Sequence, residues 1–393
     1  MSIDSTHALL RDPHSAYAAL RRSAPAHRVT LPDGAQVWLL TRYHDVRAGL
    51  ADPRLSLDKR HAEGSWRGFA LPPRLDANLL NMDAPDHTRL RRLAAQAFTA
   101  RRVEALRPRV DALAAQLLDQ HGDAATIELI GQYAAPLSIA VISELLGVPP
   151  ADQRQLRAWT NALANPAPEH RRAAGEAVLA IERFLVELIR HKRANPGDDL
   201  MTSMITARDR DDRLSEDELT ALAFLTIFAG YENATNLIAN CIFLLLRHPA
   251  ALRQVRDSPD RLRAAVEETL RYEPPAPVSI RRFTRENLPV ADVVVPARST
   301  VLLGLAAANR DPDVFEEPDS FQIRPDAPPH VSLGFGPHHC LGAALARLEA
   351  EVAVGTLLDR YARLDIDASD GHPAWRPSLR TRTLTALPVS AHT

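Results

Sequence analysis

The residues best suited to redox chemistry surround Cys340, one of two cysteines in the chain. Residues 333–342 read LGFGPHHCLG, and a strongly helical segment follows the cysteine directly. Two glycines, Gly334 and Gly336, allow a tight turn and a close approach of backbone to a flat ligand. A sulfur at the start of a helix lies near free N–H groups and the positive end of the helix dipole, which favour the thiolate. A thiolate held in this way suits the iron of a haem.

A single cysteine also has a simpler interpretation as a buried, inert core residue. We predict that role for Cys241, which lies among Ile and Leu in a long apolar segment. For Cys340 the neighbouring residues favour the haem ligand over the inert core residue. The string GFGPHHCLGAALAR over residues 334–347 resembles the signature of the cytochrome P450 family. The resemblance implies that Cys340 ligates the iron of haem b. It also places three residues against the haem: Phe335, Gly336 and Gly342. One departure is Leu333, where the family usually has Phe.

A second group of candidates lies in the most apolar part of the chain, residues 219–246. Ser215 and Glu218 form a capping-box pattern and His248-Pro249 is a stop signal, so one long helix is predicted between them. Near its middle the chain reads AGYEN over residues 229–233, which resembles the stretch of the family where dioxygen binds. The resemblance implies catalytic roles for four residues: Ala229, Gly230, Glu232 and Asn233. Among them, Glu232 matches the acid that delivers protons.

Asn233 occupies the position where the family has threonine, and an amide is a poor proton relay. Three interpretations stay open. The enzyme could perform ordinary monooxygenation with protons arriving through water, Glu232 or the substrate. It could instead perform oxidative coupling or ring formation without oxygen insertion, or Asn233 could only pack or bond within its helix. Gly230 costs about 1 kcal/mol relative to Ala inside a helix, and a local kink that opens space for a ligand would explain it.

The carboxylates of a haem need cationic or hydrogen-bonding partners. The segment 83–92 resembles the haem-binding helix of the family, with His87 and Arg91 at i,i+4 on one face. Arg282 falls in a second such segment, residues 280–284, and His338 stands two residues before the cysteine. Each of these side chains alone would fit a solvated surface position. Their common match to the family makes them the predicted haem partners.

Glu268 and Arg271 stand at i,i+3 and share a helix face. They resemble the structural ion pair that supports the haem side of the family's core. The family usually adds an arginine from a later segment, but this chain has Ser320 at that position. We therefore expect another, unidentified group to complete the pair.

The composition fits one predominantly helical protein. Of 393 residues, 47 are Lys or Arg and 49 are Asp or Glu, so no basic stripe for nucleic acid is expected. The N-terminus lacks the pattern of a signal peptide or anchor, which predicts a cytoplasmic protein with no membrane partner. Helical periodicity covers residues 87–119, 133–146, 151–163, 170–193 and 341–360, and short strands are expected at 293–295 and 300–303. The resemblance implies the P450 fold, mainly α with minor β, as a single domain over 1–393, with haem between the long helix and the helix after Cys340.

The resemblance also implies an oxidoreductase that uses O2 to hydroxylate or epoxidise a small hydrophobic substrate of secondary metabolism. No flavin or nicotinamide motif occurs, so electrons are expected from a ferredoxin and a ferredoxin reductase, with the enzyme as a monomer. Oxidative coupling is the alternative, and a non-catalytic P450-like partner protein is a minor one. Substrate contacts are expected in residues 62–80, 158–175 and 277–280, and on the long helix near Phe224, Leu225 and Phe228.

Overall fold

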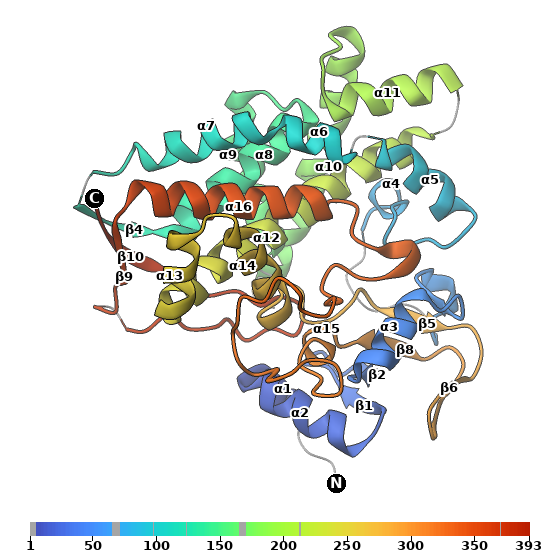
Figure 1. The fold of residues 1–393 in the computed structure, drawn as a ribbon. Helices are drawn as coiled ribbons and strands as arrows, with labels where there is room; N and C mark the ends of the chain where they lie inside the picture. Colours follow the sequence, from blue (N-terminus) through green and yellow to red (C-terminus); the bar gives the residue numbers. More distant parts are fainter. Residues whose placement is uncertain are drawn as a thin grey trace. The chain divides into compact units, whose positions relative to one another are not determined.

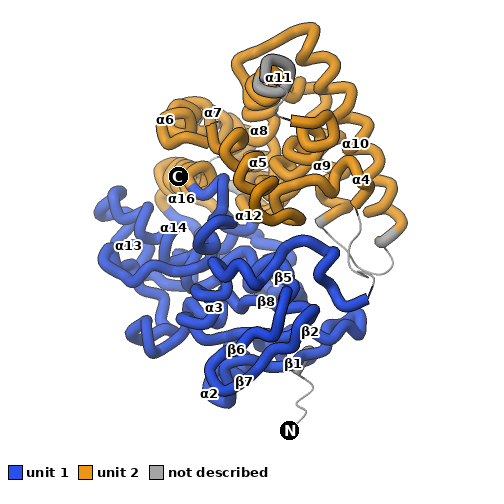
Figure 2. The backbone as a smooth tube through the Cα atoms, turned by 90° about the vertical axis from the view of Figure 1, so that its right-hand side faces the viewer, with its two compact units in different colours: residues 1–66, 236–343, 363–390 blue, residues 67–235, 344–362, 391–393 orange. Residues whose placement is uncertain are grey.

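The structure is a computed structural model that describes residues 5–64, 71–96, 98–122, 124–164, 170–211, 214–369 and 371–393 (Figure 1). Two compact units divide the chain (Figure 2). Unit 1 comprises residues 1–66, 236–343 and 363–390, and unit 2 comprises 67–235, 344–362 and 391–393. A single domain over 1–393 stays a prediction.

Unit 1 is built around a five-stranded sheet in the order β1-β2-β8-β5-β3. Its strands are β1 (Ala26–Thr30), β2 (Gln36–Leu40), β8 (Thr300–Leu303), β5 (Arg282–Thr284) and β3 (Leu55–Ser56). Strands β2 and β8 pair in parallel, whereas β1 with β2, β5 with β8 and β3 with β5 pair antiparallel. Helix α3 (Tyr43–Ala51) buries Tyr43, Val46 and Leu50 in the same apolar cluster as Leu303 of β8. The sheet and α3 therefore share one core.

The remaining elements of unit 1 are short. The helices are α1 (Ser5–Arg11), α2 (Pro13–Ser23), η1 (Lys59–His61), α13 (Pro249–Asp257), α14 (Arg261–Tyr272), α15 (Leu305–Ala308) and η4 (Gly336–His338). The strands are β6 (Leu288–Val290), β7 (Val293–Val295), β9 (Arg363–Ile366) and β10 (Pro388–His392). Strands β7 and β8 have the bounds predicted from their β-branched runs, so that prediction is confirmed.

Unit 2 is largely helical. Its elements include α4 (Pro73–Asp76), α5 (Asp86–Ala95), α6 (Ala100–Ala105), α7 (Arg107–Leu118), β4 (Ala124–Glu128), η2 (Ile130–Ala134), α8 (Ala135–Leu146), α9 (Pro150–Ala164), α10 (Arg171–Ala194) and α11 (Leu200–Asp211). Helix α16 (Ala343–Arg360) belongs to it for nearly its whole length. The helices predicted at 133–146, 151–163, 170–193 and 341–360 are confirmed to within a few residues.

The segment 87–119, predicted as one helical stretch, consists of three helices instead. Thr99 caps α6, because its side chain accepts a hydrogen bond from the N–H of Arg102 at 3.4 Å. Pro108 lies in the first turn of α7, where its missing N–H is tolerated but a continuing helix is not. Local capping residues thus overrode a periodicity that runs through the whole segment.

The long helix α12 (Glu216–Arg247) confirms the predicted bounds. Glu218 donates its N–H to the Ser215 hydroxyl at 3.0 Å, and Ser215 donates its N–H to the Glu218 carboxylate at 2.8 Å, which is a capping box. Cys241 is completely buried, so it is the core residue that was predicted, and this burial raises the pKa of its thiol to about 12. Among the described helices, none is by itself long and apolar enough to span a membrane, and only the pair α12–α13, bent by 106°, passes that test together.

Candidate active site

The cysteine loop lies in unit 1, and it presents Cys340 as an exposed residue. Gly334 and Gly336 have φ values of +77° and +75°, a backbone region that favours glycine. The Cys340 N–H donates to the Leu333 carbonyl at 2.7 Å, so the loop folds back on its own start. Helix α16 begins at Ala343, three residues after the cysteine. The predicted glycine turn before the cysteine and the predicted helix after it are confirmed.

The loop packs on helix α3. A Cβ at Gly336 would lie 3.0 Å from the Cβ and 3.2 Å from the Cα of Ala51, closer than side-chain contacts normally are. The Arg47 guanidinium lies over the Phe335 ring, 4.0 Å from its centroid, while Phe335 itself is 37% exposed. A cation over an aromatic face is an attractive contact. Sequence reasoning missed this support, because nothing in the residues around Arg47 indicates a partner so distant in the chain.

The predicted pair on α14 forms as a buried, two-pronged ion pair. Arg271 donates from Nε and Nη2 to the two carboxylate oxygens of Glu268, each at 2.8 Å. Both side chains are nearly inaccessible, at 7% and 5% exposure. A guanidinium matches a carboxylate in this planar geometry, which lysine cannot reproduce.

Backbone groups complete this pair where the family's arginine is missing. The remaining guanidinium hydrogens of Arg271 go to the carbonyls of Asn309 at 3.0 Å, Pro318 at 2.8 Å and Ser320 at 2.9 Å. The Gln322 N–H donates to the Glu268 carboxylate at 2.8 Å. Because main-chain carbonyls and an N–H satisfy the pair, the side chain at position 320 is not needed for it.

The four predicted cationic residues divide between the two units. His87 is buried and Arg91 is half-buried on α5 of unit 2. In unit 1, Arg282 is buried in β5, where Nη1 lies 3.4 Å from the Leu55 carbonyl, and His338 is half-buried in η4. An exposed cysteine on a loop, with arginine and histidine side chains in the same unit, fits the chemistry of an iron porphyrin that carries carboxylates.

The centre of α12 combines a buried acid with an exposed amide. Glu232 is 8% exposed, whereas Asn233 is an exposed residue between buried neighbours. Leu225 and Ala229 are half-buried and precede Asn233 at spacings of four residues, so the three lie along one stripe of the helix. The Asn233 amide donates to the Ala229 carbonyl at 3.1 Å. Asn233 therefore bonds within its helix and is also accessible.

Gly230 has a packing role different from the suggested kink. A Cβ at this position would lie 2.4 Å from Cδ1 of Ile142 on α8, so glycine lets the two helices approach closely. The next residue, Tyr231, is buried and donates its hydroxyl to the Asn161 side chain on α9 at 2.6 Å. Burial raises the pKa of Tyr231. The sequence did not predict the contact of Gly230 with Ile142 or that of Tyr231 with Asn161, since neither Ile142 nor Asn161 belongs to a recognisable motif.

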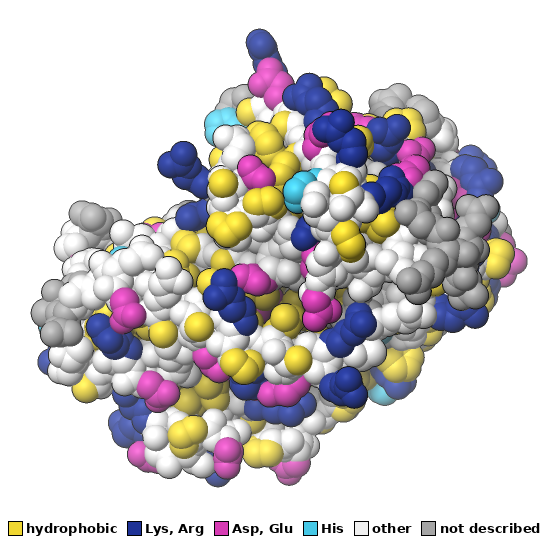
Figure 3. Space-filling view, turned by 90° about the horizontal axis from the view of Figure 1, so that it is seen from above, with side chains coloured by type: hydrophobic (Ala, Val, Ile, Leu, Met, Phe, Trp, Pro, Cys, Tyr) yellow, Lys and Arg dark blue, Asp and Glu magenta, His cyan; other side chains and the backbone are white. Residues whose placement is uncertain are grey.

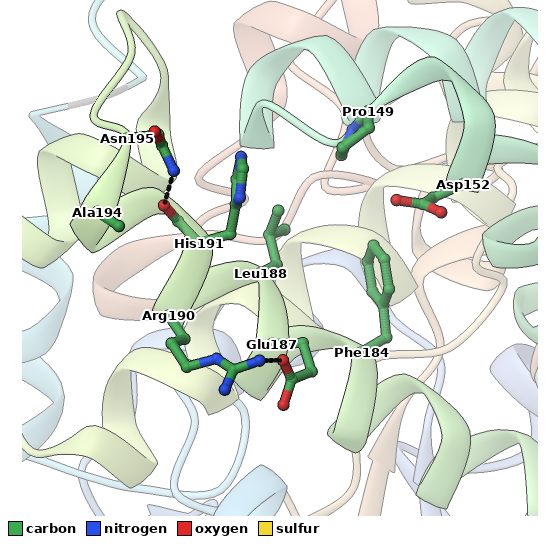
Figure 4. A pocket seen from close by; sticks show the side chains of 9 residues that line it. All are labelled: Pro149, Asp152, Phe184, Glu187, Leu188, Arg190, His191, Ala194 and Asn195. Carbon is green, nitrogen blue, oxygen red and sulfur yellow. Dashed lines mark hydrogen bonds and ion pairs between the residues drawn. The ribbon is translucent and has the colours of Figure 1, made fainter.

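A cavity of about 450 Å³ lies elsewhere in unit 2 and opens between α9 and α10 (Figure 4). It is lined by Pro149, Asp152, Phe184, Glu187, Leu188, Arg190, His191, Ala194 and Asn195. Its polar groups are partly engaged, because Glu187 pairs with Arg190 and Asn195 donates to the His191 carbonyl at 3.3 Å. No predicted site residue lines this cavity, so it is not the candidate active site.

On the face of the molecule drawn in Figure 3, basic and acidic side chains are interspersed. This distribution agrees with the nearly balanced total of 47 basic and 49 acidic residues. A face of mixed charge does not resemble the basic stripe of a nucleic-acid-binding protein.

Comparison with known proteins identifies the family. The family model for cytochrome P450 matches residues 151–374. Cytochrome P450 107B1 of Saccharopolyspora erythraea is 45% identical, with 97% of this chain and 96% of the relative covered. The cytochrome P450 monooxygenase PikC of Streptomyces venezuelae is 43% identical, with 96% and 91% covered.

Solved structures give the same result for the fold. The myxobacterial cytochrome P450 CYP267B1 in complex with myristic acid superposes with a TM-score of 0.92 at 37% identity, covering 99% of this chain and 98% of the other. The cytochrome P450 CxnD, an enzyme for C–S bond formation in chuangxinmycin biosynthesis, superposes with a TM-score of 0.86 at 33% identity, covering 97% and 95%. The chain belongs to the cytochrome P450 family, whose cofactor is haem iron, and is an enzyme of the monooxygenase class with the P450 fold.

Proposed function

We propose that Cys340 is the axial ligand of haem b, and that the enzyme hydroxylates or epoxidises a small hydrophobic compound of secondary metabolism. The observation that carries this proposal is that Cys340 is an exposed residue, held on a glycine turn three residues before α16. Free N–H groups at the start of α16 favour the thiolate over the thiol. When bound, the haem supplies the activation of dioxygen, which no amino-acid side chain can perform.

The haem carboxylates are assigned to arginine and histidine side chains that match the family's haem-binding segments. Arg91 and Arg282 provide guanidinium groups, and His87 and His338 provide imidazole donors. Charge-assisted hydrogen bonds of this kind are short and about twice as strong as neutral ones. The loop itself is proposed to contact the flat face of the haem through three residues: Phe335, Gly336 and Gly342.

Proton delivery is assigned to Glu232 and water. The Asn233 amide N–H already donates to the Ala229 carbonyl, and an amide cannot pass a proton onward at neutral pH. Asn233 is therefore assigned to orient the substrate by a hydrogen bond. The buried carboxyl of Glu232 is assigned to hold the proton that water transfers. This assignment favours ordinary monooxygenation with a water relay.

The substrate class follows from the accessible stripe of α12. Leu225 and Ala229 are apolar, and Phe228 stacks on Phe224 with nearly parallel rings 5.9 Å apart. An apolar wall with one polar group, Asn233, suits a hydrophobic molecule that is oriented by a single hydrogen bond. The segments 62–80 and 158–175 were also predicted to contact substrate, but parts of them, 65–70 and 165–169, lie outside the described residues.

Electrons are assigned to a ferredoxin and its reductase, and the enzyme is proposed to be a cytoplasmic monomer formed by one domain over 1–393. A second reaction, oxidative coupling without oxygen insertion, is retained because CxnD is described as an enzyme for C–S bond formation.

Product mass under isotopically labelled dioxygen tests the proposal, with a surrogate ferredoxin system and ligands that shift the ferric haem spectrum. We expect the product to gain one labelled oxygen atom. Loss of two hydrogens without label would instead support coupling and overturn the monooxygenation assignment for the substrate tested.

A further inference from the structure

We infer that Asn309 is a positioning residue that ties the cysteine loop to the Glu268–Arg271 pair and thereby sets where Cys340 presents its sulfur. The inference rests on the proposed function, in which Cys340 ligates the haem iron. Asn309 directly follows α15 and is completely buried, at 0% exposure. All the residues that it contacts belong to unit 1.

Three polar groups of Asn309 make hydrogen bonds to other segments: the side-chain oxygen, the side-chain nitrogen and the backbone carbonyl. Their partners lie on α14 or in the segment 331–332. Its side-chain oxygen accepts the Val331 N–H at 2.9 Å, and its side-chain nitrogen donates to the Ser332 hydroxyl at 2.6 Å. The same nitrogen lies 3.5 Å from the Leu270 carbonyl, to which the Ser332 hydroxyl donates at 2.5 Å. The Asn309 carbonyl accepts from Nη1 of Arg271 at 3.0 Å. One residue therefore joins α14 to the segment that begins the cysteine loop.

From that segment, backbone hydrogen bonds lead directly to the cysteine. The Val331 carbonyl accepts the Gly334 N–H at 2.9 Å, which closes the first turn of the loop. The Leu333 carbonyl accepts the Cys340 N–H at 2.7 Å, which closes its far end. Asn309 thus fixes Val331, and the loop closed on Val331 and Leu333 fixes the backbone of Cys340.

Asparagine is the side chain that this position requires. It offers an acceptor to the Val331 N–H and a donor to the Ser332 hydroxyl at the same time. Aspartate would keep the acceptor but lose the donor, and alanine would lose both and leave the buried Val331 N–H unsatisfied. A buried donor left without a partner costs more than an average hydrogen bond contributes. The loop would relieve this cost by shifting toward water, which moves the sulfur.

The test compares Asn309→Ala with Asn240→Ala in the purified haem-loaded enzyme. Asn240 is a matched control, because it is also completely buried and its side-chain nitrogen donates to two backbone carbonyls, those of Glu273 at 3.2 Å and Arg382 at 3.0 Å. Neither carbonyl belongs to the cysteine loop. Two readouts are taken: the fraction of the reduced carbon monoxide complex with a thiolate-type Soret band, and the rate of haem transfer to excess apomyoglobin.

For Asn309→Ala we expect a reduced thiolate fraction and haem transfer faster by about tenfold or more, since two hydrogen bonds that hold the loop are lost. Asn240→Ala should lower the temperature of unfolding to a similar degree but leave the thiolate fraction at the wild-type value. Asn309→Asp should lie between wild type and Asn309→Ala. Should Asn309→Ala fail to fold, Ser332→Ala removes only one hydroxyl and should change both readouts in the same direction.

The outcomes separate this inference from the proposed function. A wild-type protein without the thiolate band would contradict Cys340 as the ligand. A wild-type protein with the band, together with Asn309 and Ser332 variants that match Asn240→Ala in both readouts, would overturn the role of Asn309 alone.

Discussion

Replacing Glu349 with glutamine should stabilise the protein, and the gain should grow as the pH rises. Glu349 lies on α16 and is 1% exposed, and its buried Oε2 has no hydrogen-bond partner among the described residues. Burial raises the pKa of this carboxyl well above its ordinary value of 4.5. The folded protein therefore keeps this acid neutral to a higher pH than the unfolded chain does.

The size of the effect follows from proton linkage. Above pH 4.5 the unfolded chain releases the Glu349 proton, but the folded protein keeps it until the raised pKa is reached. Folding must then take up a proton, so the free energy of unfolding falls by about 1.4 kcal/mol for each pH unit. The fall continues until the raised pKa of Glu349 is reached, and glutamine avoids it because it does not titrate.

Urea unfolding at pH 5, 6, 7 and 8 measures this difference for wild type and Glu349→Gln. Glu351→Gln is the matched control, since Glu351 lies two residues further along α16, is half-buried, and is 3.5 Å from Nη2 of Arg107. The Glu351→Gln difference from wild type should stay nearly flat over this range. A flat difference for Glu349→Gln as well would show that the Glu349 carboxyl is charged in the folded protein, and the reasoning from burial would be wrong.

Three further variants test the other polar groups. Burial alone would raise the pKa of Glu273, but hydrogen bonds and charges from His14 and Arg382 lower it to about 2. The carboxylate of Glu273 therefore stabilises the fold above pH 4.5, and this stabilisation is lost as the pH falls toward 2. Glu273→Gln should cost about 3–5 kcal/mol at pH 7 in urea unfolding, because it leaves buried cations uncompensated. Arg271→Lys should prevent stable haem incorporation, measured as the haem-to-protein absorbance ratio, since lysine cannot make the two-pronged contact. Asn233→Thr should maintain or improve the ratio of product to reductant consumed, and a steep loss of product would indicate a specific role for the amide.

The sequence predicted those parts of the site that depend on local spacing. The cysteine loop, the capping box of α12 and the Glu268–Arg271 pair each involve residues within about one or two turns of one another, so their types and spacing carry the information. The family resemblance supplied the rest of the expected site.

The parts that sequence could not predict depend on backbone groups and distant partners. Arg271 donates hydrogen bonds to three backbone carbonyls, and the side chains of those residues take no part in the contact. Residue types in the sequence therefore could not identify these partners. The kink proposed for Gly230 stays a prediction, whereas its close packing against Ile142 on another helix could not be read from the sequence. Glu349 follows the helical pattern of its segment, and only the three-dimensional packing reveals that its side chain is buried with Oε2 unpaired among the described residues.

The reduced carbon monoxide spectrum of Cys340→Ser, compared with wild type, tests the central claim most directly. The wild-type enzyme should show the shifted Soret band of a thiolate-ligated haem, and the variant should lose that band together with turnover, because serine offers no thiolate. A variant that retained both the band and the turnover would contradict Cys340 as the ligand.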